Sequence, residues 1–347
     1  MANVEDAEIP PYERIPSSQS RALAAAIRLG IRPFSGRVKG GPAGVRLWRS
    51  LLGAGAYCLR ADPRVSVEPF NDPCVESPEI RRPVRGEWLR PPGGDARNGV
   101  VLYLHGGAYA ICSPRTHRVI TTRLAMETGM PVLVPRYRQA PEHPFPAAFE
   151  DALDAYRLLL ARGLPPERIT VVGDSSGGHL AASLAGEACR TDLPKPAGVA
   201  LFSPWIDLTG ELATTSQMLR KDPFIVPAVA TRFGRLYVGS GDWSDPRLSL
   251  LNCASADLPP FLIQVGGIEV LRDEAERFAE VLAEAGAVYE LQVWPGQMHV
   301  FQMFNRLLPE ADAAMREAAR FIRRNVDHGS FPEATRPAAD APPPAAA

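Results

Sequence analysis

The stretch from residue 169 to residue 184 reads ITVVGDSSGGHLAASL, and it predicts the centre of both the fold and the site. An apolar segment typical of a buried strand leads through GDSSGG into small residues typical of a helix. Ser175 lies in the middle of a G-x-S-x-G pattern, between Gly173 and Gly177. In that context the pattern predicts a sharp strand-to-helix turn that exposes the serine hydroxyl, with glycine where a Cβ atom would clash. Ser175 is therefore the candidate nucleophile.

A serine hydroxyl becomes a strong nucleophile when a base accepts its proton and a carboxylate orients that base. His299 is the candidate base, because it follows the last expected strand in the turn PGQM. The acid should follow the apolar segment FLIQVG, where Glu269, Asp273 and Glu274 are available. We assign Glu269, which is nearest the strand end, and keep Asp273, in the first turn of the next helix, as the alternative.

The reaction also needs amide donors for the negative charge that forms on the substrate oxygen. The apolar run NGVVLYL at 98–104 leads directly into the sequence His105-Gly106-Gly107. We expect the backbone amides of Gly106, Gly107 and Ser176 to form this oxyanion hole. The side chain of His105 is expected to anchor the loop rather than to react.

The composition is that of an ordinary globular protein, with 46% hydrophobic and 22% charged residues. The 38 basic residues nearly balance the 39 acidic ones, which favours a small-molecule substrate over nucleic acid or an anionic membrane. No run approaches the roughly 18 apolar residues of a membrane span, and the N-terminus has no apolar signal segment. The five cysteines are scattered, odd in number and without C-x-x-C spacing, which favours reduced thiols in the cytoplasm and no zinc site.

Apolar segments alternate with helical patterns along the chain, which predicts a mostly parallel, doubly wound α/β sheet. Helical patterns at 17–32 and 45–59 precede the first expected strand, and the segment 206–258 interrupts the alternation. We interpret these pieces as a cap over the active site. The expected strands lie at 86–90, 98–104, 131–137, 169–173, 198–203, 261–266 and 289–294, and expected core helices at 147–161, 273–285 and 310–326.

These patterns divide the chain into five parts. They are N-terminal cap helices at 1–75, a first part of the α/β core at 76–205, a connection with a second cap segment at 206–258, a last part of the core at 259–328, and a Pro/Ala-rich tail at 329–347 that is expected to be disordered.

Five blocks of the sequence resemble the bacterial hormone-sensitive-lipase-like (family IV) esterases of the α/β-hydrolase superfamily. The resemblance implies a largely parallel eight-stranded sheet flanked by helices, a helical cap, and a serine carboxylesterase that needs no cofactor or metal and acts on short acyl chains. It also leaves room for a homodimer. The blocks are HGGAYAICSPRTHR from residue 105, YRQAPEHPFPAAFEDAL from 137, GDSSGGHLAASLA from 173, SPWIDLT from 203 and WPGQMHVFQMF from 294.

Three positions depart from the pattern of that family. Ala108 replaces a third glycine of the oxyanion loop, Cys112 replaces a later glycine, and Glu269 stands where an aspartate is usual.

The candidate triad of Ser175, His299 and Glu269 would also support an acetyl hydrolase (an N- or O-deacetylase) or a lactone hydrolase. A catalytically silent receptor is the rival from another class, and the presence of both Ser175 and His299 argues against it.

Overall fold

The computed structural model describes residues 10–30, 32–35, 41–55, 59–73, 79–252 and 254–328. The tail at 329–347, for which disorder was expected, lies outside the described residues, as does the end of the expected second helix at 56–58. Among the described residues, no helix combines the length and apolar character needed to cross a membrane.

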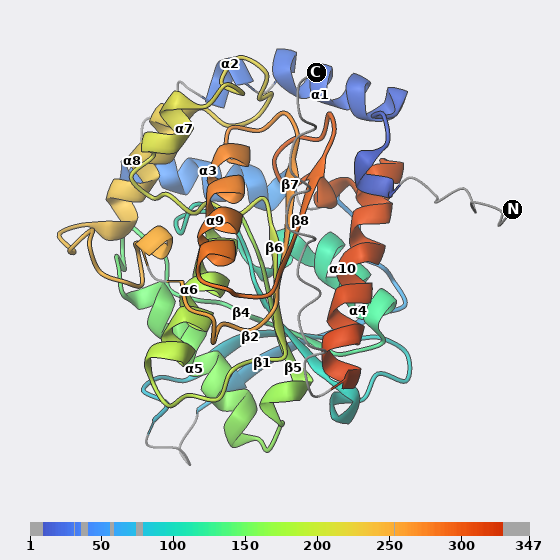
Figure 1. Cartoon of the computed structure of the whole chain (residues 1–347), viewed down its shortest axis with the longest axis vertical. Helices are drawn as coiled ribbons and strands as arrows, with labels where there is room; N and C mark the ends of the chain where they lie inside the picture. The colour runs from blue at the N-terminus through green and yellow to red at the C-terminus, as the bar shows by residue number, and fades with distance from the viewer. Residues whose placement is uncertain are drawn as a thin grey trace, which may run out of the picture.

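Eight strands form one sheet in the order β1-β2-β4-β3-β5-β6-β7-β8 (Figure 1). β2 runs antiparallel to both β1 and β4, whereas β3 to β8 pair in parallel. The central strands are buried on both faces, as their continuous apolar sequences require. The strands are β1 (Ser66–Asp72), β2 (Val84–Arg90), β3 (Val100–Leu104), β4 (Val132–Pro135), β5 (Ile169–Asp174), β6 (Gly198–Phe202), β7 (Phe261–Gly266) and β8 (Tyr289–Trp294).

Helices cover both faces of the sheet, which confirms the expected α/β-hydrolase architecture. In Figure 1, α5, α6 and α9 lie on one side of the sheet, and α4 and α10 pack against each other on the other side. Two hydrophobic cores result, one on each face. The core helices are α4 (Arg118–Thr128), α5 (Ala147–Ala161), α6 (Ser176–Arg190), α9 (Arg272–Glu284) and α10 (Pro309–His328).

The remaining helices come from the N-terminal segment and from residues 206–258. The two segments contact each other, because Arg32 Nη2 donates to the carbonyl oxygen of Leu219 at 2.7 Å and Arg28 donates to that of Arg220. In Figure 1 these helices gather at the top and upper left of the molecule. They are α1 (Ser18–Gly30), α2 (Arg32–Ser35), α3 (Pro42–Gly55), α7 (Glu211–Thr215) and α8 (Pro227–Val238).

Candidate active site

Ser175 lies at the turn between β5 and α6, with φ 52° and ψ −122°. This backbone conformation is strained for any residue with a Cβ atom, and such strain is concentrated at functional sites. The flanking glycines make the turn feasible. A Cβ atom at Gly177 would collide with the carbonyl oxygen of Leu104, and one at Gly173 would collide with that of Gly177. The local sequence therefore exposes the Ser175 hydroxyl at the carboxyl end of the sheet.

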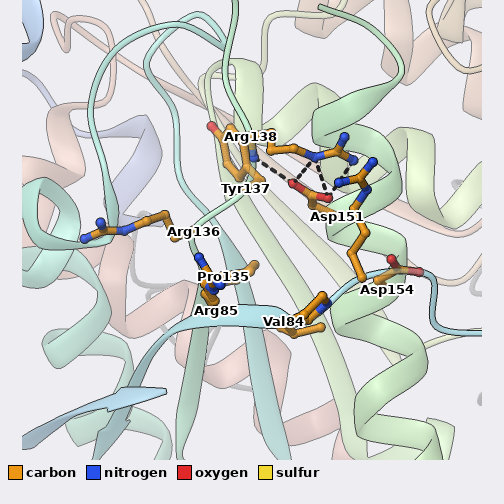
Figure 2. Close-up of a pocket in the computed structure, with 10 residues that line it drawn as sticks. Val84, Arg85, Pro135, Arg136, Tyr137, Arg138, Asp151 and Asp154 are labelled. Carbon is orange, nitrogen blue, oxygen red and sulfur yellow. Dashed lines mark hydrogen bonds and ion pairs between the residues drawn. The ribbon is translucent and has the colours of Figure 1, made fainter. Parts of the chain in front are cut away.

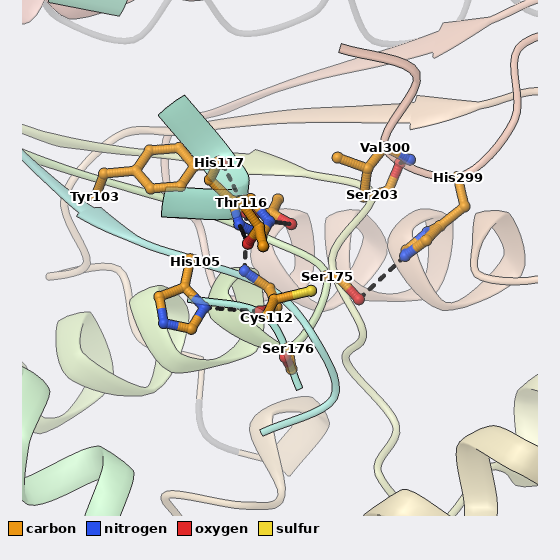
Figure 3. Close-up of polar contacts among 12 residues, drawn as sticks. Tyr103, His105, Cys112, Thr116, His117, Ser175, Ser176, Ser203, His299 and Val300 are labelled. Carbon is orange, nitrogen blue, oxygen red and sulfur yellow. Dashed lines mark hydrogen bonds and ion pairs between the residues drawn. The ribbon is translucent and has the colours of Figure 1, made fainter. Parts of the chain in front are cut away.

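The structure brings Ser175, His299 and Glu269 together from three separate loops. His299 Nε2 lies 3.1 Å from Ser175 Oγ, and His299 Nδ1 lies 2.7 Å from Glu269 Oε2 (Figure 3 shows the first contact). His299 follows β8, and Glu269 follows β7. Asp273, the alternative acid, is half-buried in the first turn of α9 and has no hydrogen bond to His299 within the described part of the chain.

The second oxygen of Glu269 is also fully engaged. Ser203 Oγ–H donates to Glu269 Oε1 at 2.7 Å, and the Gly266 amide donates to the same oxygen at 2.6 Å. Ser203 in turn accepts a hydrogen bond of 3.0 Å from the amide of Val300, the residue after His299. Ser203, with φ 48° at the end of β6, thus connects the acid loop to the histidine loop. The sequence analysis did not identify it.

The surroundings of His299 favour its protonated form. Burial alone would lower the pKa of His299, but the hydrogen bond and negative charge of Glu269, with smaller contributions from Asp222 and Asp174, raise the pKa above its usual value. The acceptor on Nδ1 is a carboxylate, so Nδ1 carries a proton and Nε2 of the neutral ring is free to accept one from Ser175. The arrangement is that of a general base held in one tautomer.

The oxyanion loop corrects one sequence expectation. The Gly106 amide donates to Asp174 Oδ1 at 2.9 Å and is therefore unavailable to a substrate. The amides of Gly107 and Ala108 donate to no acceptor among the described residues. Both residues have positive φ, 113° and 51°, which turns their amides away from regular pairing. Ser176 is the first residue of α6, and its amide donates to no acceptor in the described part of the chain, as is usual at a helix N-terminus.

A buried network around Asp174 holds this loop in place. Tyr103 donates its hydroxyl to Asp174 Oδ1 at 2.6 Å, and His117 Nε2 lies 3.2 Å from Asp174 Oδ2. Burial would raise the pKa of Asp174, but the charge and hydrogen bond of His117 with the bonds from Tyr103 and Gly106 lower it. Sequence reasoning missed His117 because it lies 57 residues from Asp174 along the chain. Burial would lower the pKa of His117, but the charge and hydrogen bond of Asp174 raise it, so the two side chains form an ion pair whenever His117 is protonated.

Two other buried histidines remain neutral at ordinary pH. His105 stacks on Tyr137 with ring centroids 4.3 Å apart, and its Nδ1 lies 2.8 Å from the carbonyl oxygen of Gly106. Burial lowers the pKa of His105 to about 3 and that of His179 to about 4. His179 lies 2.6 Å from the hydroxyl of Tyr109. Figure 3 shows His105 turned away from the contact between Ser175 and His299.

The described residues contain no cluster of His, Cys, Asp and Glu side chains that could hold a metal ion. Burial raises the pKa of the Cys112 thiol to about 12, so it is not a thiolate. A separate pocket of about 360 Å³ (Figure 2) contains none of the three triad residues. Its most prominent contact is the ion pair of Arg138 with Asp151, at 2.8 Å.

The sheet, its flanking helices and the sharp turn that carries Ser175 after β5 are those of the α/β-hydrolase fold. A family model described as alpha/beta hydrolase fold matches residues 101–303. The chain is 39% identical to an acetyl-hydrolase of Streptomyces hygroscopicus over 70% of this chain and 81% of that protein. It is 36% identical to an esterase of Acinetobacter venetianus over 72% of this chain and 82% of that protein.

Solved structures agree with these relatives. The crystal structure of an esterase from the bacterial hormone-sensitive lipase family superposes with a TM-score of 0.78 at 33% identity, covering 90% of this chain and 100% of that one. The chain therefore belongs to the α/β-hydrolase fold family and, within it, to the bacterial hormone-sensitive-lipase-like esterases. It is an esterase-class hydrolase.

Proposed function

We propose that the chain is a cofactor-free serine carboxylesterase that hydrolyses short-chain acyl esters through an acyl-enzyme intermediate. The single observation that carries the proposal is the continuous contact from Ser175 Oγ through His299 to Glu269, at 3.1 Å and 2.7 Å. These distances lie within hydrogen-bond reach without any movement of the loops.

In the first half-reaction, Ser175 Oγ attacks the ester carbonyl carbon while its proton moves to His299 Nε2. The carbonyl electron pair moves onto the oxygen, and the amides of Gly107, Ala108 and Ser176 receive the resulting oxyanion. When the tetrahedral intermediate collapses, the bond to the alcohol oxygen breaks, and His299 returns the proton to that oxygen. The alcohol leaves, and the acyl group remains on Ser175.

In the second half-reaction, water takes the place of the alcohol. His299 accepts a proton from water as the oxygen attacks the acyl carbon, and the same amides receive the negative charge. Collapse breaks the bond to Ser175 Oγ, which regains its proton from His299, and the carboxylic acid is released. Glu269 remains ionised throughout and stabilises the imidazolium that forms in each half-reaction.

The same proposal assigns a cap to the N-terminal helices and residues 206–258. The contacts of Arg28 and Arg32 with the carbonyl groups of Arg220 and Leu219 support a joint unit. A cytoplasmic location fits the free thiols of Cys112 and Cys189, since a reducing compartment keeps cysteines unpaired.

A preference for acetyl groups is supported by the acetyl-hydrolase relative. Amide deacetylation and lactone opening would use the same three side chains, so these activities belong in the same substrate panel.

The test is hydrolysis of p-nitrophenyl esters of increasing acyl length, together with an N-acetyl amide and a γ-lactone. We expect kcat/KM to be highest for the acetate and butyrate and to fall for longer chains. The Ser175→Ala variant should lose at least about 10⁴-fold in kcat for every substrate that the wild type hydrolyses. A wild type that hydrolyses amides or lactones faster than all esters would overturn the ester assignment.

A further inference from the structure

An exposed aromatic side chain lies beside the proposed catalytic base. Phe224, from the segment 206–258, has its ring centroid 6.1 Å from that of His299, with the two planes tilted by 30°. Phe224 is 40% exposed as a whole residue, whereas the side chain of His299 is only 8% exposed. Phe224 therefore presents apolar surface to solvent next to an almost fully covered imidazole.

A buried carboxylate fixes the position of Phe224. Asp222 Oδ1 accepts hydrogen bonds from the amides of Phe224 and Ile225, at 2.7 Å and 2.9 Å. Asp222 Oδ2 accepts a bond of 2.8 Å from the amide of Val270, the residue after Glu269. Asp222 is fully buried, so these bonds are shielded from competing water.

A second contact fixes the preceding part of the same segment. The carbonyl groups of Leu219 and Arg220 accept hydrogen bonds from Arg32 and Arg28. The turn that carries Phe224 is therefore held from two sides, by the N-terminal helices and by the acid loop. These contacts hold the backbone that carries Phe224 at a fixed position relative to His299.

The chemistry of ester cleavage determines which part of the substrate meets this side chain. His299 Nε2 must reach the alcohol oxygen to protonate it as the ester bond breaks. The carbonyl oxygen must instead point toward the amides of Gly107, Ala108 and Ser176. The alcohol group of the ester thus extends along the histidine side of the site, where Phe224 lies.

We propose that Phe224 forms the subsite for the alcohol portion of the ester, and that this subsite takes apolar, preferably aromatic, alcohol groups. The inference rests on the proposed function and adds the alcohol class to it. The carboxylate of Asp222, which holds this turn, is already bonded to three amides and offers nothing to a polar alcohol. Contact with an aryl ring would cover apolar surface of Phe224 that is now exposed to water.

The experiment compares 2-phenylethyl acetate, ethyl acetate and ethyl butyrate as substrates of the wild type and of Phe224→Ala. We expect Phe224→Ala to lower kcat/KM for 2-phenylethyl acetate by about tenfold, mainly through KM, because covering apolar surface contributes binding in both ground and transition state. The two ethyl esters should change by less than about twofold, and Phe224→Leu should retain most of the preference. Trp243→Ala is the matched control, since Trp243 is an exposed aromatic residue of the same segment.

Three results would overturn the assignment. The first is an equal loss of kcat/KM on all three esters in Phe224→Ala. The second is a loss of kcat/KM that depends on the acyl chain rather than on the alcohol. The third is the same loss of kcat/KM in Trp243→Ala. Binding of 2-phenylethanol, measured by calorimetry, tests the subsite without turnover, and Phe224→Ala should weaken this binding while Trp243→Ala should not. A wild type that binds this alcohol through Phe224 but cleaves no ester would refute the proposed function alone, and equal binding by wild type and Phe224→Ala would refute the subsite alone.

Discussion

Glu269 is one methylene longer than the aspartate that its family usually places here, and its contacts show how the longer side chain fits. Ser203 and the Gly266 amide hold one carboxylate oxygen, which leaves the other directed at His299. The sequence could predict Glu269 over Asp273 because Glu269 lies nearer the strand end. It could not predict Ser203, whose role depends on a positive φ and on a partner 66 residues away.

Substitution of the two candidate acids should separate them sharply. Glu269→Gln should lower kcat by about 10³- to 10⁴-fold, because an amide cannot stabilise the imidazolium and can hold the wrong tautomer. Asp273→Asn, the matched control, should change kcat by less than about threefold. Steady-state hydrolysis of p-nitrophenyl acetate measures both. The assignment would be contradicted if Asp273→Asn abolished turnover while Glu269→Gln preserved it.

The pH dependence should report the raised pKa of His299. Only neutral His299 can accept the Ser175 proton, so kcat/KM should fall as the pH decreases through that pKa. Because the pKa of His299 lies above its usual value of 6.5, the midpoint of this acid limb should lie above pH 6.5. A pH profile of kcat/KM for a substrate without ionisable groups provides the measurement. A limb centred well below pH 6.5 would show that Glu269 does not stabilise the imidazolium.

At the scale of elements, the oxyanion loop after β3 and the turn that carries Ser175 are joined by a direct hydrogen bond. The sequence motif predicted this loop as the source of oxyanion donors but not which of its amides is free, because the Gly106 amide donates to Asp174. A Cβ atom at Gly106 would collide with the Asp174 carboxylate, which explains the need for glycine at this position. The motif therefore encodes a contact between the loop and the turn as well as the oxyanion donors.

The buried Asp174 should contribute strongly to stability. Asp174→Ala leaves His117 without its charged partner and Tyr103 without its acceptor, so we expect a loss of about 3–5 kcal/mol in the free energy of unfolding. Asp192→Ala, which removes an exposed aspartate, should change that free energy by no more than about 0.5 kcal/mol. Urea denaturation followed by circular dichroism measures both. Similar stabilities for the two variants would show that the network is not important for the fold.

Strongly patterned elements could be predicted from the sequence, and weakly patterned ones could not. The expected helix at 147–161 and strand at 289–294 have the observed bounds of α5 and β8. β1 was missed because it is an edge strand with Pro69 in its middle and mostly exposed side chains. α4 was missed because RVITTRLAMET is rich in β-branched residues, and packing against α10 stabilises its helical form.

At the scale of the whole molecule, the N-terminal helix is part of the core around the histidine loop. Ile27 of α1 is buried with Trp294 and Met298, which flank the turn before His299. Ser20 of α1 also hydrogen-bonds Gln297 in that turn, 277 residues away along the chain, with Gln297 Nε2 donating at 3.0 Å. The sequence pattern predicted the helix, but one sequence alone does not reveal which distant residues this helix contacts.

Ile27→Ala should therefore destabilise the whole protein. We expect a loss of about 2–4 kcal/mol in the free energy of unfolding from the cavity created beside Trp294. Leu29→Ala on the same helix is the matched control, because Leu29 is 79% exposed and its removal should cost no more than about 0.5 kcal/mol. Chemical denaturation monitored by tryptophan fluorescence compares them. Equal effects would indicate that α1 packs only loosely against the histidine loop.

If the proposed mechanism holds, Ser175 becomes covalently acylated during turnover. Rapid quenching of the wild type in the first turnover with p-nitrophenyl acetate, followed by peptide mass analysis, tests it most directly. We expect one acetyl group on the peptide containing Ser175, formed with a burst of p-nitrophenol, and neither signal in Ser175→Ala. Acetylation of a different residue, or undiminished hydrolysis by Ser175→Ala, would contradict it.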